Sequence, residues 1–281
     1  MGTTTVNLIG AGRVGQTLAR LLPATQSYVL QDVSSRRLKS AKDAAAFGRN
    51  ARAVEHLADM RPANIWILAV PDSKIAEVAR TLSDSNPDSV LQGSRPVALH
   101  CSGFYPAAQM DALNEYGWGL ASAHPVLSFS DPETAASQVS CVPCGIEGDP
   151  YAASIATSLF EEMGAECFSI RSDAKSLYHA AAVISNNFTV VLQALAREAW
   201  AEAGVSEDMA ARLNEKLLTG TCENVAAQGP QVALTGPAAR GDTDVVAQQN
   251  RVVAGWHPTA GELYAQLSDL ARSLKSSGKT R

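Results

Sequence analysis

The sequence predicts an α/β protein with a doubly wound parallel sheet in its N-terminal part and an all-α C-terminal part. A short apolar run, Val6 to Ile9, leads into G-x-G-x-x-G at Gly10 to Gly15, the pattern by which a strand turns into a helix around a pyrophosphate. Short β-rich runs then alternate with helical stretches, which is typical of a parallel sheet covered by helices on both faces. From Ser172 onward the β pattern stops, and segments rich in Ala, Leu, Glu and Arg take over.

Each predicted strand is a short apolar run bounded by turn residues. The strands are Val6 to Ile9, Tyr28 to Gln31, Ile65 to Val70, Val97 to Cys101, Gly119 to Ala123, Cys141 to Ile146 and Glu166 to Ser169. The turns at Pro71 and at Ser102-Gly103 follow strands, so we expect them at the carboxyl edge of the sheet, where doubly wound folds bind ligands.

The C-terminal part is expected to contain four helices. The first starts near Asp173, with Ser172 or Asp173 as its N-cap, and runs to about residue 203, where Gly204 closes it. The others span about 206–228, 244–254 and 260–274. We therefore predict a nucleotide-binding domain over residues 1–171 and a helical substrate and dimerisation domain over residues 172–281.

The glycine-rich loop predicts a dinucleotide site. Gly10 would allow the tight turn, Gly12 would let the backbone approach the phosphates, and Gly15 would let the helix pack against its strand. The phosphates would lie on the free N–H groups at the helix N-terminus. The predicted contacts are Gly10, Ala11, Gly12, Arg13, Val14 and Gly15, with Val70, Pro71 and Ser102 at the neighbouring strand ends. The alternative is a plain strand–helix turn.

The end of the second strand offers two candidates for the ribose side of the cofactor. Asp32 could accept a hydrogen bond from a 2′-hydroxyl, as in NAD sites. The segment Ser34-Ser35-Arg36-Arg37 offers hydroxyls and guanidinium groups, which suit a 2′-phosphate. We expect Asp32 to lie inside the strand and therefore favour NADP, with NADPH preferred over NADH. The alternative for the two arginines is a solvated helix start.

A polar stripe on an apolar helix is the main catalytic candidate. Because helical residues rotate by about 100° each, Lys175, His179 and Asn186 fall within about 40° of one another. The apolar residues around them predict a buried face, where a cation beside a histidine is costly unless it is used. Lys175 would act as the acid and His179 as its partner. Alternatively, Lys175 reaches solvent and Asn186 bonds a neighbouring helix.

Two further clusters are candidates for the active site, with His124 as a catalytic residue and Ser128 and Arg240 as substrate contacts. His124 and Ser128 follow a predicted strand in His124-Pro-Val-Leu-Ser-Phe129, so we place both at the cleft; the alternative is a loop fixed by proline. Arg240, in Leu234-Thr-Gly-Pro-Ala-Ala-Arg-Gly-Asp242, could clamp a carboxylate or phosphate. The alternative there is a turn in which Asp242 caps the next helix.

Composition narrows the function classes. The chain has 281 residues, 46% of them hydrophobic, and a formal charge of −5, with no basic face for nucleic acid and no polybasic membrane anchor. The immediate first strand predicts a cytoplasmic protein without a signal peptide. Cys141-x-x-Cys144 lies in a strand-like run, so we favour reduced core thiols over a redox role, and no metal site is expected.

Five segments together resemble Rossmann-like NADP-binding oxidoreductases related to pyrroline-5-carboxylate reductase, the β-hydroxyacid dehydrogenases and the deazaflavin-dependent NADP reductases. They are GAGRVG at residues 10–15, SSRR at 34–37, HPVLSF at 124–129, KSLYHAAAVISNN at 175–187 and LTGPAARGD at 234–242. β-Hydroxyacid dehydrogenases use a lysine and an asparagine four residues later; Lys175 matches the first, whereas His179 occupies the second position.

The resemblance implies an NADP cofactor and a helical C-terminal domain like that of 6-phosphogluconate dehydrogenase, which pairs two subunits and brings the Arg240 loop toward a neighbour's cleft. The leading hypothesis is an NADP-dependent oxidoreductase acting on a small carbonyl or imine compound. A non-catalytic NADPH-binding sensor or scaffold, and a deazaflavin-dependent NADP reductase, are the alternatives.

Overall fold

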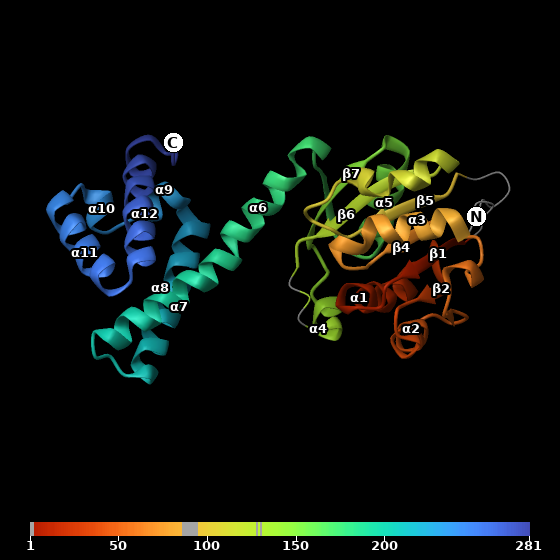
Figure 1. Ribbon diagram of the computed structural model, residues 1–281, viewed down its shortest axis with the longest axis horizontal. Helices are drawn as coiled ribbons and strands as arrows, with labels where there is room; N and C mark the ends of the chain where they lie inside the picture. The colour runs from red at the N-terminus through yellow and green to blue at the C-terminus, as the bar shows by residue number, and fades with distance from the viewer. Residues whose placement is uncertain (1–2, 86–94, 128, 130) are drawn as a thin grey trace. The chain divides into compact units, whose positions relative to one another are not determined.

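The computed structural model describes residues 3–85, 95–127, 129 and 131–281. The first of two compact units, Met1–Val183, contains an eight-stranded sheet in the order β3-β2-β1-β4-β5-β6-β7-β8 (Figure 1). The strands are β1 Thr4–Ile9, β2 Tyr28–Ser34, β3 Arg52–Val54, β4 Ile65–Leu68, β5 Val97–His100, β6 Gly119–Pro125, β7 Pro143–Gly148 and β8 Glu166–Ser169.

Strand order reverses between β1 and β4, so the loops after these strands lie at the switch point of a doubly wound sheet. The predicted fold class is confirmed, with two differences. The three-residue β3 is too short to show periodicity in the sequence. In addition, β7 is antiparallel to β6 whereas the other neighbouring strands pair in parallel. The start of β7 therefore lies beside the end of β6.

Helices cover both faces of the sheet (Figure 1). One core cluster joins side chains of α1 (Arg13–Leu21), α2 (Leu38–Ala45) and α5 (Pro150–Glu162) to β1, β2 and β7. The other face packs against α3 (Ile75–Ser85) and the 3-10 helix η4 (Ala107–Tyr116). Shorter elements are α4 Pro132–Ser137, η1 Leu22–Ala24, η2 Leu57–Asp59, η3 Asp72–Lys74 and η5 Ser172–Ala174.

The second unit, Ile184–Arg281, is helical. Its helices are α7 Asn187–Glu202, α8 Glu207–Gln228, α9 Pro230–Ala233, α10 Pro237–Arg240, α11 Thr243–Trp256 and α12 Pro258–Ser277. Gly204 and Gly229, with φ of +83° and +75°, follow α7 and α8, and Gly204 lies where the sequence predicts the helix end. No helix in the described ranges is both long and apolar enough to cross a lipid bilayer.

The helix predicted from residue 173 to 203 is interrupted. α6 spans Lys175–Ser185, and α7 begins at Asn187; Asn186 between them has right-handed backbone angles, with φ −106° and ψ −66°. The sequence also predicts that the apolar side chains of this stretch are buried. Within the single chain this prediction is wrong, because Leu177, Ile184 and Val191 are 74%, 61% and 53% exposed. Helical spacing alone does not distinguish a face that packs within the chain from one left open.

Candidate active site at the carboxyl edge of the sheet

The glycine-rich loop has the geometry that its spacing predicts. Gly10 has φ +98°, and a Cβ atom there would collide with the carbonyl oxygen of Ala69. A Cβ on Gly15 would overlap the carbonyl oxygen of Gly10, so α1 packs closely onto the loop. By contrast, a Cβ on Gly12 would meet no atom within 4 Å. Gly10 and Gly15 are thus required by the fold, whereas Gly12 borders open space at the helix N-terminus.

The N-terminus of α1 provides backbone donors beside this space. The helix begins at Arg13 with Gly12 as its N-cap, and the first N–H groups of a helix have no intrahelical acceptors. Gly12 and Arg13 are exposed, so these donors and the positive end of the helix dipole are accessible to an anion. This is the arrangement that the loop prediction requires for a pyrophosphate.

The loop between β2 and α2 lies against the glycine-rich loop. The N–H of Gly10 donates to the carbonyl of Ser34 at 2.8 Å, and the N–H of Ala11 donates to the Ser35 hydroxyl at 3.3 Å. Arg36 and Arg37 follow and are exposed. Within the described part of the chain, neither guanidinium has a hydrogen bond or ion pair. Both charges are available to an anionic ligand at this edge.

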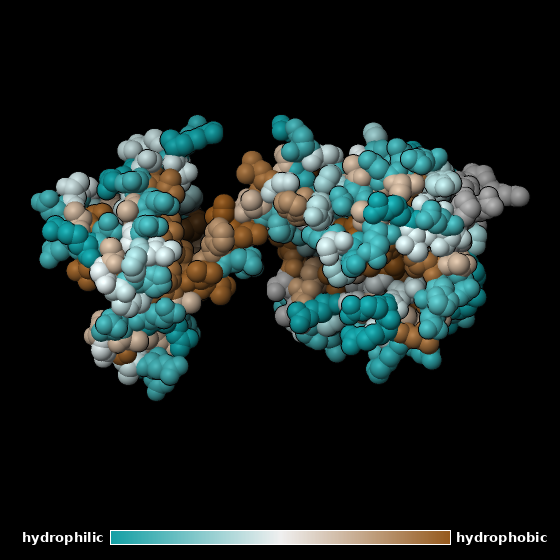
Figure 2. Space-filling model, viewed as in Figure 1, coloured by the Kyte–Doolittle hydropathy of each residue, from teal (hydrophilic) through white to brown (hydrophobic). Residues whose placement is uncertain are grey.

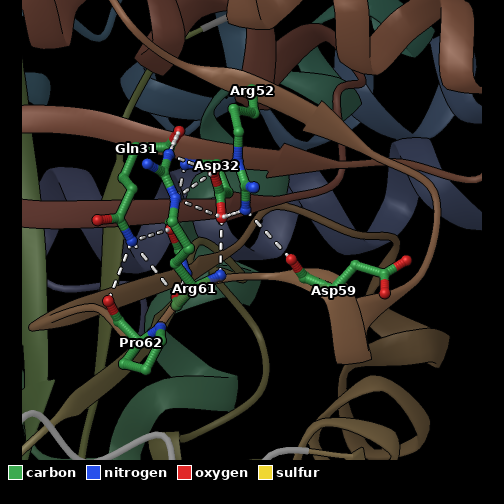
Figure 3. A network of polar contacts seen from close by, with 7 residues as sticks. Gln31, Asp32, Arg52, Asp59, Arg61 and Pro62 are labelled. Carbon is green, nitrogen blue, oxygen red and sulfur yellow. Dashed lines mark hydrogen bonds and ion pairs between the residues drawn. The ribbon is translucent and has the colours of Figure 1, made fainter.

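Asp32 is engaged elsewhere (Figure 3). Its carboxylate is fully buried and forms ion pairs with Arg52 at 2.9 Å and with Arg61 at 2.6 Å. The backbone N–H of Arg61 also donates to it at 2.7 Å. Burial raises the pKa of Asp32, but hydrogen bonds from both arginines outweigh burial and hold the pKa at about 2. Both carboxylate oxygens therefore already have partners.

The loops after β4 and β5 are joined through Ser102. Its hydroxyl donates to the Asp72 carboxylate at 2.9 Å and accepts from the N–H groups of Phe104 and Tyr105 at 3.1 and 3.0 Å. Ser102 is buried, whereas Pro71 is exposed and Val70 is half-buried. In this structure Ser102 shapes the loop that borders the predicted nicotinamide side.

His124 and His179 meet at the same edge of the sheet. His124 lies near the end of β6 and His179 in α6, with their ring centroids 6.1 Å apart. A Cβ on Gly103 would come within 2.7 Å of His124 Nε2 and 2.6 Å of His179 Cδ2, so both rings pack against the β5 loop. Burial, and then the nearby positive charge of Lys175, lower the pKa of His124 to about 4. His124 is therefore neutral near pH 7.

Sequence reasoning missed Tyr178, which completes this cluster. Its hydroxyl lies 2.8 Å from His124 Nδ1, and the two rings are edge-to-face with centroids 5.6 Å apart. The polar stripe predicted from the sequence covers the face of α6 that carries Lys175 and His179. Tyr178 points about 100° away from His179 and therefore lies outside that face. A tyrosine directly before a histidine in an apolar helix was the available signal.

Lys175 is enclosed rather than open to solvent. Its side chain has no exposed surface, and its ammonium group contacts the Ser122 hydroxyl and lies 3.3 Å from the Glu147 carboxylate. Glu147 also accepts from Ser122 and the backbone of Ala107 at 2.7 Å. Burial lowers the pKa of Lys175, whereas Glu147 opposes that shift. The alternative in which this lysine reaches solvent is wrong, and no hydrogen bond between Lys175 and His179 occurs in the described part of the chain.

The remaining predicted residues lie outside this cluster. Asn186, at the break between α6 and α7, and Arg240, at the end of α10, both belong to the second unit. Asn186 is exposed. Arg240 pairs with Asp242 at 3.0 Å. Ser128 lies outside the described residues.

The cysteine pair of the C-x-x-C motif is divided between surface and core. Cys141 is exposed with φ +61°, whereas Cys144 is buried in β7. Burial raises the pKa of the Cys144 thiol far above its usual value, which is the opposite of a reactive thiol. No group of three or more metal-binding side chains suited to an ion occurs among the residues that the structure describes.

Comparisons with known proteins agree with this architecture. Residues 5–91 match the family model for NADP oxidoreductase, coenzyme F420-dependent, and residues 142–271 match a domain of unknown function (DUF2520). No curated protein matches the chain. Among solved structures, protein TM1727 from Thermotoga maritima is 27% identical with a TM-score of 0.77, and the match covers 97% of this chain and 99% of that one.

Two more distant structures share the fold. The imine reductase BcSIRED from Bacillus cereus is 17% identical with a TM-score of 0.63, covering 98% of this chain and 94% of that one. A pyrroline-5-carboxylate reductase from Coxiella burnetii is 14% identical with a TM-score of 0.59, covering 95% and 98%. Residues 5–91 thus match an NADP oxidoreductase model at the glycine-rich loop, and the two reductase structures show that this chain shares their fold over nearly its whole length.

Proposed function

We propose that the protein is an NADPH-dependent reductase of a small carbonyl or imine compound. The observation that carries this proposal is the convergence of the anion-binding loop and the His124–His179 pair on one edge of the sheet. Ile9, Leu68, His100 and Ser122 are aligned across β1, β4, β5 and β6, so the loops that follow them lie side by side. A cofactor with its phosphates at Gly12 would extend toward the histidines.

The ribose end supports a preference for NADPH over NADH. A 2′-phosphate needs cations and hydroxyl donors, which Arg36, Arg37 and the serines at 34 and 35 supply. A 2′-hydroxyl is bound in NAD sites by a free carboxylate at the end of the second strand. Asp32, the candidate for that role, is buried and held by two arginines. The contacts therefore favour the phosphorylated cofactor.

The histidine cluster supports the proton chemistry of a reduction. Bound NADPH would supply a hydride to the carbon of a C=O or C=N bond, becoming NADP⁺, and the oxygen or nitrogen must then take a proton. We assign His179 as the proton donor and the neutral His124 as a hydrogen-bond donor to the developing charge. Lys175, fully buried, would act behind them by keeping His124 uncharged. Ser128 and Arg240 stay predicted substrate contacts, and Asn186 stays a predicted catalytic residue.

The helical unit supports a homodimer. Most of the exposed large apolar side chains in the described part of the chain belong to it, among them Phe188, Leu217 and Val252. Apolar residues are visible over the α6–α7 segment (Figure 2). Large exposed apolar patches mark interaction surfaces, so we propose that residues 172–281 form the substrate and dimerisation domain and that a second copy covers this surface.

A second candidate is hydride exchange between NADPH and a deazaflavin. It is favoured by the family model that residues 5–91 match, which describes coenzyme F420-dependent NADP oxidoreductases. The match covers the nucleotide-binding part of the chain. A protein that binds NADPH without turnover is the remaining alternative.

In the first test, wild type and Arg36→Ala are each titrated with NADPH and with NADH, and binding is measured by fluorescence. Loss of a guanidinium–phosphate contact should weaken NADPH binding about tenfold to a hundredfold and leave NADH binding unchanged. Arg80→Ala, which removes an exposed arginine from α3, is the control and should change neither affinity. Absence of binding by either nucleotide would refute the proposal.

The same protein, saturated with NADPH, is then mixed with small keto acids, cyclic imines and a deazaflavin. Oxidation of NADPH, seen as loss of its absorbance, establishes the reductase and identifies the substrate class. Oxidation by the deazaflavin alone favours the second candidate. Tight NADPH binding without turnover across the panel would favour the non-catalytic alternative.

A further inference from the structure

We propose that Tyr178 is a positioning residue that holds His124 in the tautomer with its proton on Nε2, directed toward the reaction site. This inference rests on the reductase proposed above. It assigns a role to a residue that neither the sequence motifs nor the comparisons single out. It also makes a statement about His124 that can be measured without any substrate.

The strand pairing creates the place that the tyrosine hydroxyl occupies. His124 of β6 and Gly145 of β7 are partners in the antiparallel ladder. A Cβ on Gly145 would come within 3.0 Å of the Tyr178 hydroxyl oxygen, so the absence of a side chain lets the phenol reach over β7 to the ring of His124. The Tyr178 ring also contacts Phe168 of β8, with centroids 6.1 Å apart. These contacts fix the tyrosine from three strands and its own helix.

The direction of the hydrogen bond follows from the partners present. The Tyr178 hydroxyl lies 2.8 Å from His124 Nδ1 and has no other hydrogen-bond partner among the described residues. If Nδ1 carried the proton, the phenol hydrogen would have no acceptor among the described residues. If Tyr178 donates to Nδ1, both groups are satisfied. The proton of neutral His124 then resides on Nε2.

His100 shows by contrast what a purely structural histidine looks like here. Its Nδ1 accepts from the N–H of Ser102 at 3.2 Å, and its Nε2 lies 3.1 Å from the Pro106 carbonyl. Both of its ring nitrogens are therefore used by the backbone. His124 Nε2 has no hydrogen-bond partner in the described part of the chain and faces Gly103 and His179. This nitrogen is the one available to a ligand.

The charges around His124 agree with a neutral ring. Lys175 and His179 disfavour its protonation, whereas Asp72 favours it more weakly. Burial raises the pKa of Tyr178, so its hydroxyl keeps its proton and remains a donor. A neutral imidazole with Nε2–H can donate a hydrogen bond to an oxygen or nitrogen that gains negative charge as hydride arrives. The proton itself is supplied by another group, which we assign as His179.

The direct test is ¹⁵N NMR of the histidine side chains at pH 7 in wild type, Tyr178→Phe and the control Tyr151→Phe, with His124→Gln to assign the signals. Tyr151 also donates a hydroxyl hydrogen bond, to the Arg95 carbonyl at 3.1 Å. We expect His124 in the Nε2–H form in wild type and in Tyr151→Phe, and a mixture of tautomers in Tyr178→Phe. An Nδ1–H form in wild type, or an unchanged His124 spectrum in Tyr178→Phe, would overturn the proposal.

The signals of His100 report whether the fold is intact, because its two hydrogen bonds lie in the neighbouring loop. If Tyr178→Phe changes the His100 signals, the test uses fluorotyrosine at position 178 instead of phenylalanine. Fluorotyrosine changes the acidity of the hydroxyl while keeping the ring. The His124 shifts should then move while those of His100 stay constant. Constant His124 shifts would refute the hydrogen bond.

Kinetics separates this inference from the proposed function. Where turnover is found, Tyr178→Phe should lower kcat about tenfold or more and leave the NADPH Kd unchanged, whereas Tyr151→Phe should change neither. An unchanged kcat would refute a positioning role. If no panel compound is reduced, the reductase proposal fails, and the NMR result still decides whether Tyr178 sets the tautomer.

Discussion

Asp32 illustrates how one residue can be withdrawn from a ligand site by its neighbours. It lies in β2, two residues before the strand ends, and the charge that could have met a ribose hydroxyl is neutralised by Arg52 and Arg61. Both arginines are partly exposed, so the pair is anchored in the core but hydrated at its outer side. The ion pairs of Asp32 should therefore mainly affect the stability of the fold and not cofactor binding.

We predict that Asp32→Asn destabilises the fold by about 2–4 kcal/mol at pH 7, because it leaves two guanidinium groups without their buried partner. Because the folded-state pKa is below the ordinary value of 3.8, the ion pair contributes fully above about pH 4 and is lost as the pH falls toward about 2. The stability of the variant should thus depend less on pH in that window.

Urea unfolding at pH 7 and at pH 3 measures both effects. Asp43→Asn, which breaks an exposed pair with Lys39, is the matched control and should change stability by less than about 0.5 kcal/mol. The NADPH-to-NADH affinity ratio should stay constant in Asp32→Asn. A large gain in NADPH affinity, or a loss of NADH binding, would show that Asp32 contacts the ribose after all.

For single residues, local backbone roles could be predicted from the sequence better than the side-chain contacts that each residue makes. The roles of Gly10 and Gly15 in the loop follow from local backbone geometry, and the spacing of the glycines was sufficient to predict them. The burial of Lys175 was not predictable in the same way, because its partners Ser122 and Glu147 come from distant strands that only the β6–β7 pairing brings together. Tyr178 was missed for the same reason, since its partner His124 is 54 positions away.

Among the elements, the strand-to-helix unit β1–α1 connects the local sequence most directly to the proposed function. Strands and helices with clear periodicity were predicted, whereas β3 and the direction of β7 depend on pairing across the sheet and leave no local pattern. The break at Asn186 also escaped prediction, because asparagine is tolerated inside helices and neither proline nor glycine marks the position.

The glycine-rich loop gives a prediction in which two similar substitutions have opposite effects. Gly15→Ala should destabilise the protein by about 1–3 kcal/mol, because its Cβ overlaps the backbone of Gly10. Gly12→Ala should leave stability nearly unchanged, since its Cβ meets open space and its φ of −77° suits alanine. It should nevertheless weaken NADPH binding at least tenfold, because that space is where the phosphates are proposed to lie.

Thermal unfolding and NADPH titration of both variants check this pair. Each variant serves as the control for the other, because both add the same methyl group within one turn. Normal NADPH affinity in Gly12→Ala would contradict a phosphate site at this loop. Unchanged stability in Gly15→Ala would show that α1 can move away from the loop at little cost.

At the scale of the whole molecule, most of the exposed large apolar side chains in the described part of the chain lie in the helical unit. The sheet unit buries its large side chains in two clusters, whereas helices of the second unit leave Ile184, Phe188 and Val191 more than half exposed. Phe188 and Val191 lie three residues apart and so share one face of α7. Such a face is stable in water when another surface covers it, and we have proposed that a second copy does so.

We therefore predict that wild type sediments as a dimer of the 29.5 kDa chain and that Phe188→Asp with Val191→Glu sediments as a monomer. Two charges placed in an apolar interface would each have to be desolvated without a partner, at a cost of several kcal/mol. Tyr116→Glu, which adds a charge to an exposed aromatic residue of the sheet unit, should remain dimeric. A monomeric wild type would refute the dimer, and a dimeric double variant would move the interface to other helices.

In the predicted monomer, turnover should fall while NADPH binding persists, because the phosphate loop and the arginines that follow β2 lie in the sheet unit, whereas Arg240 lies in the helical one.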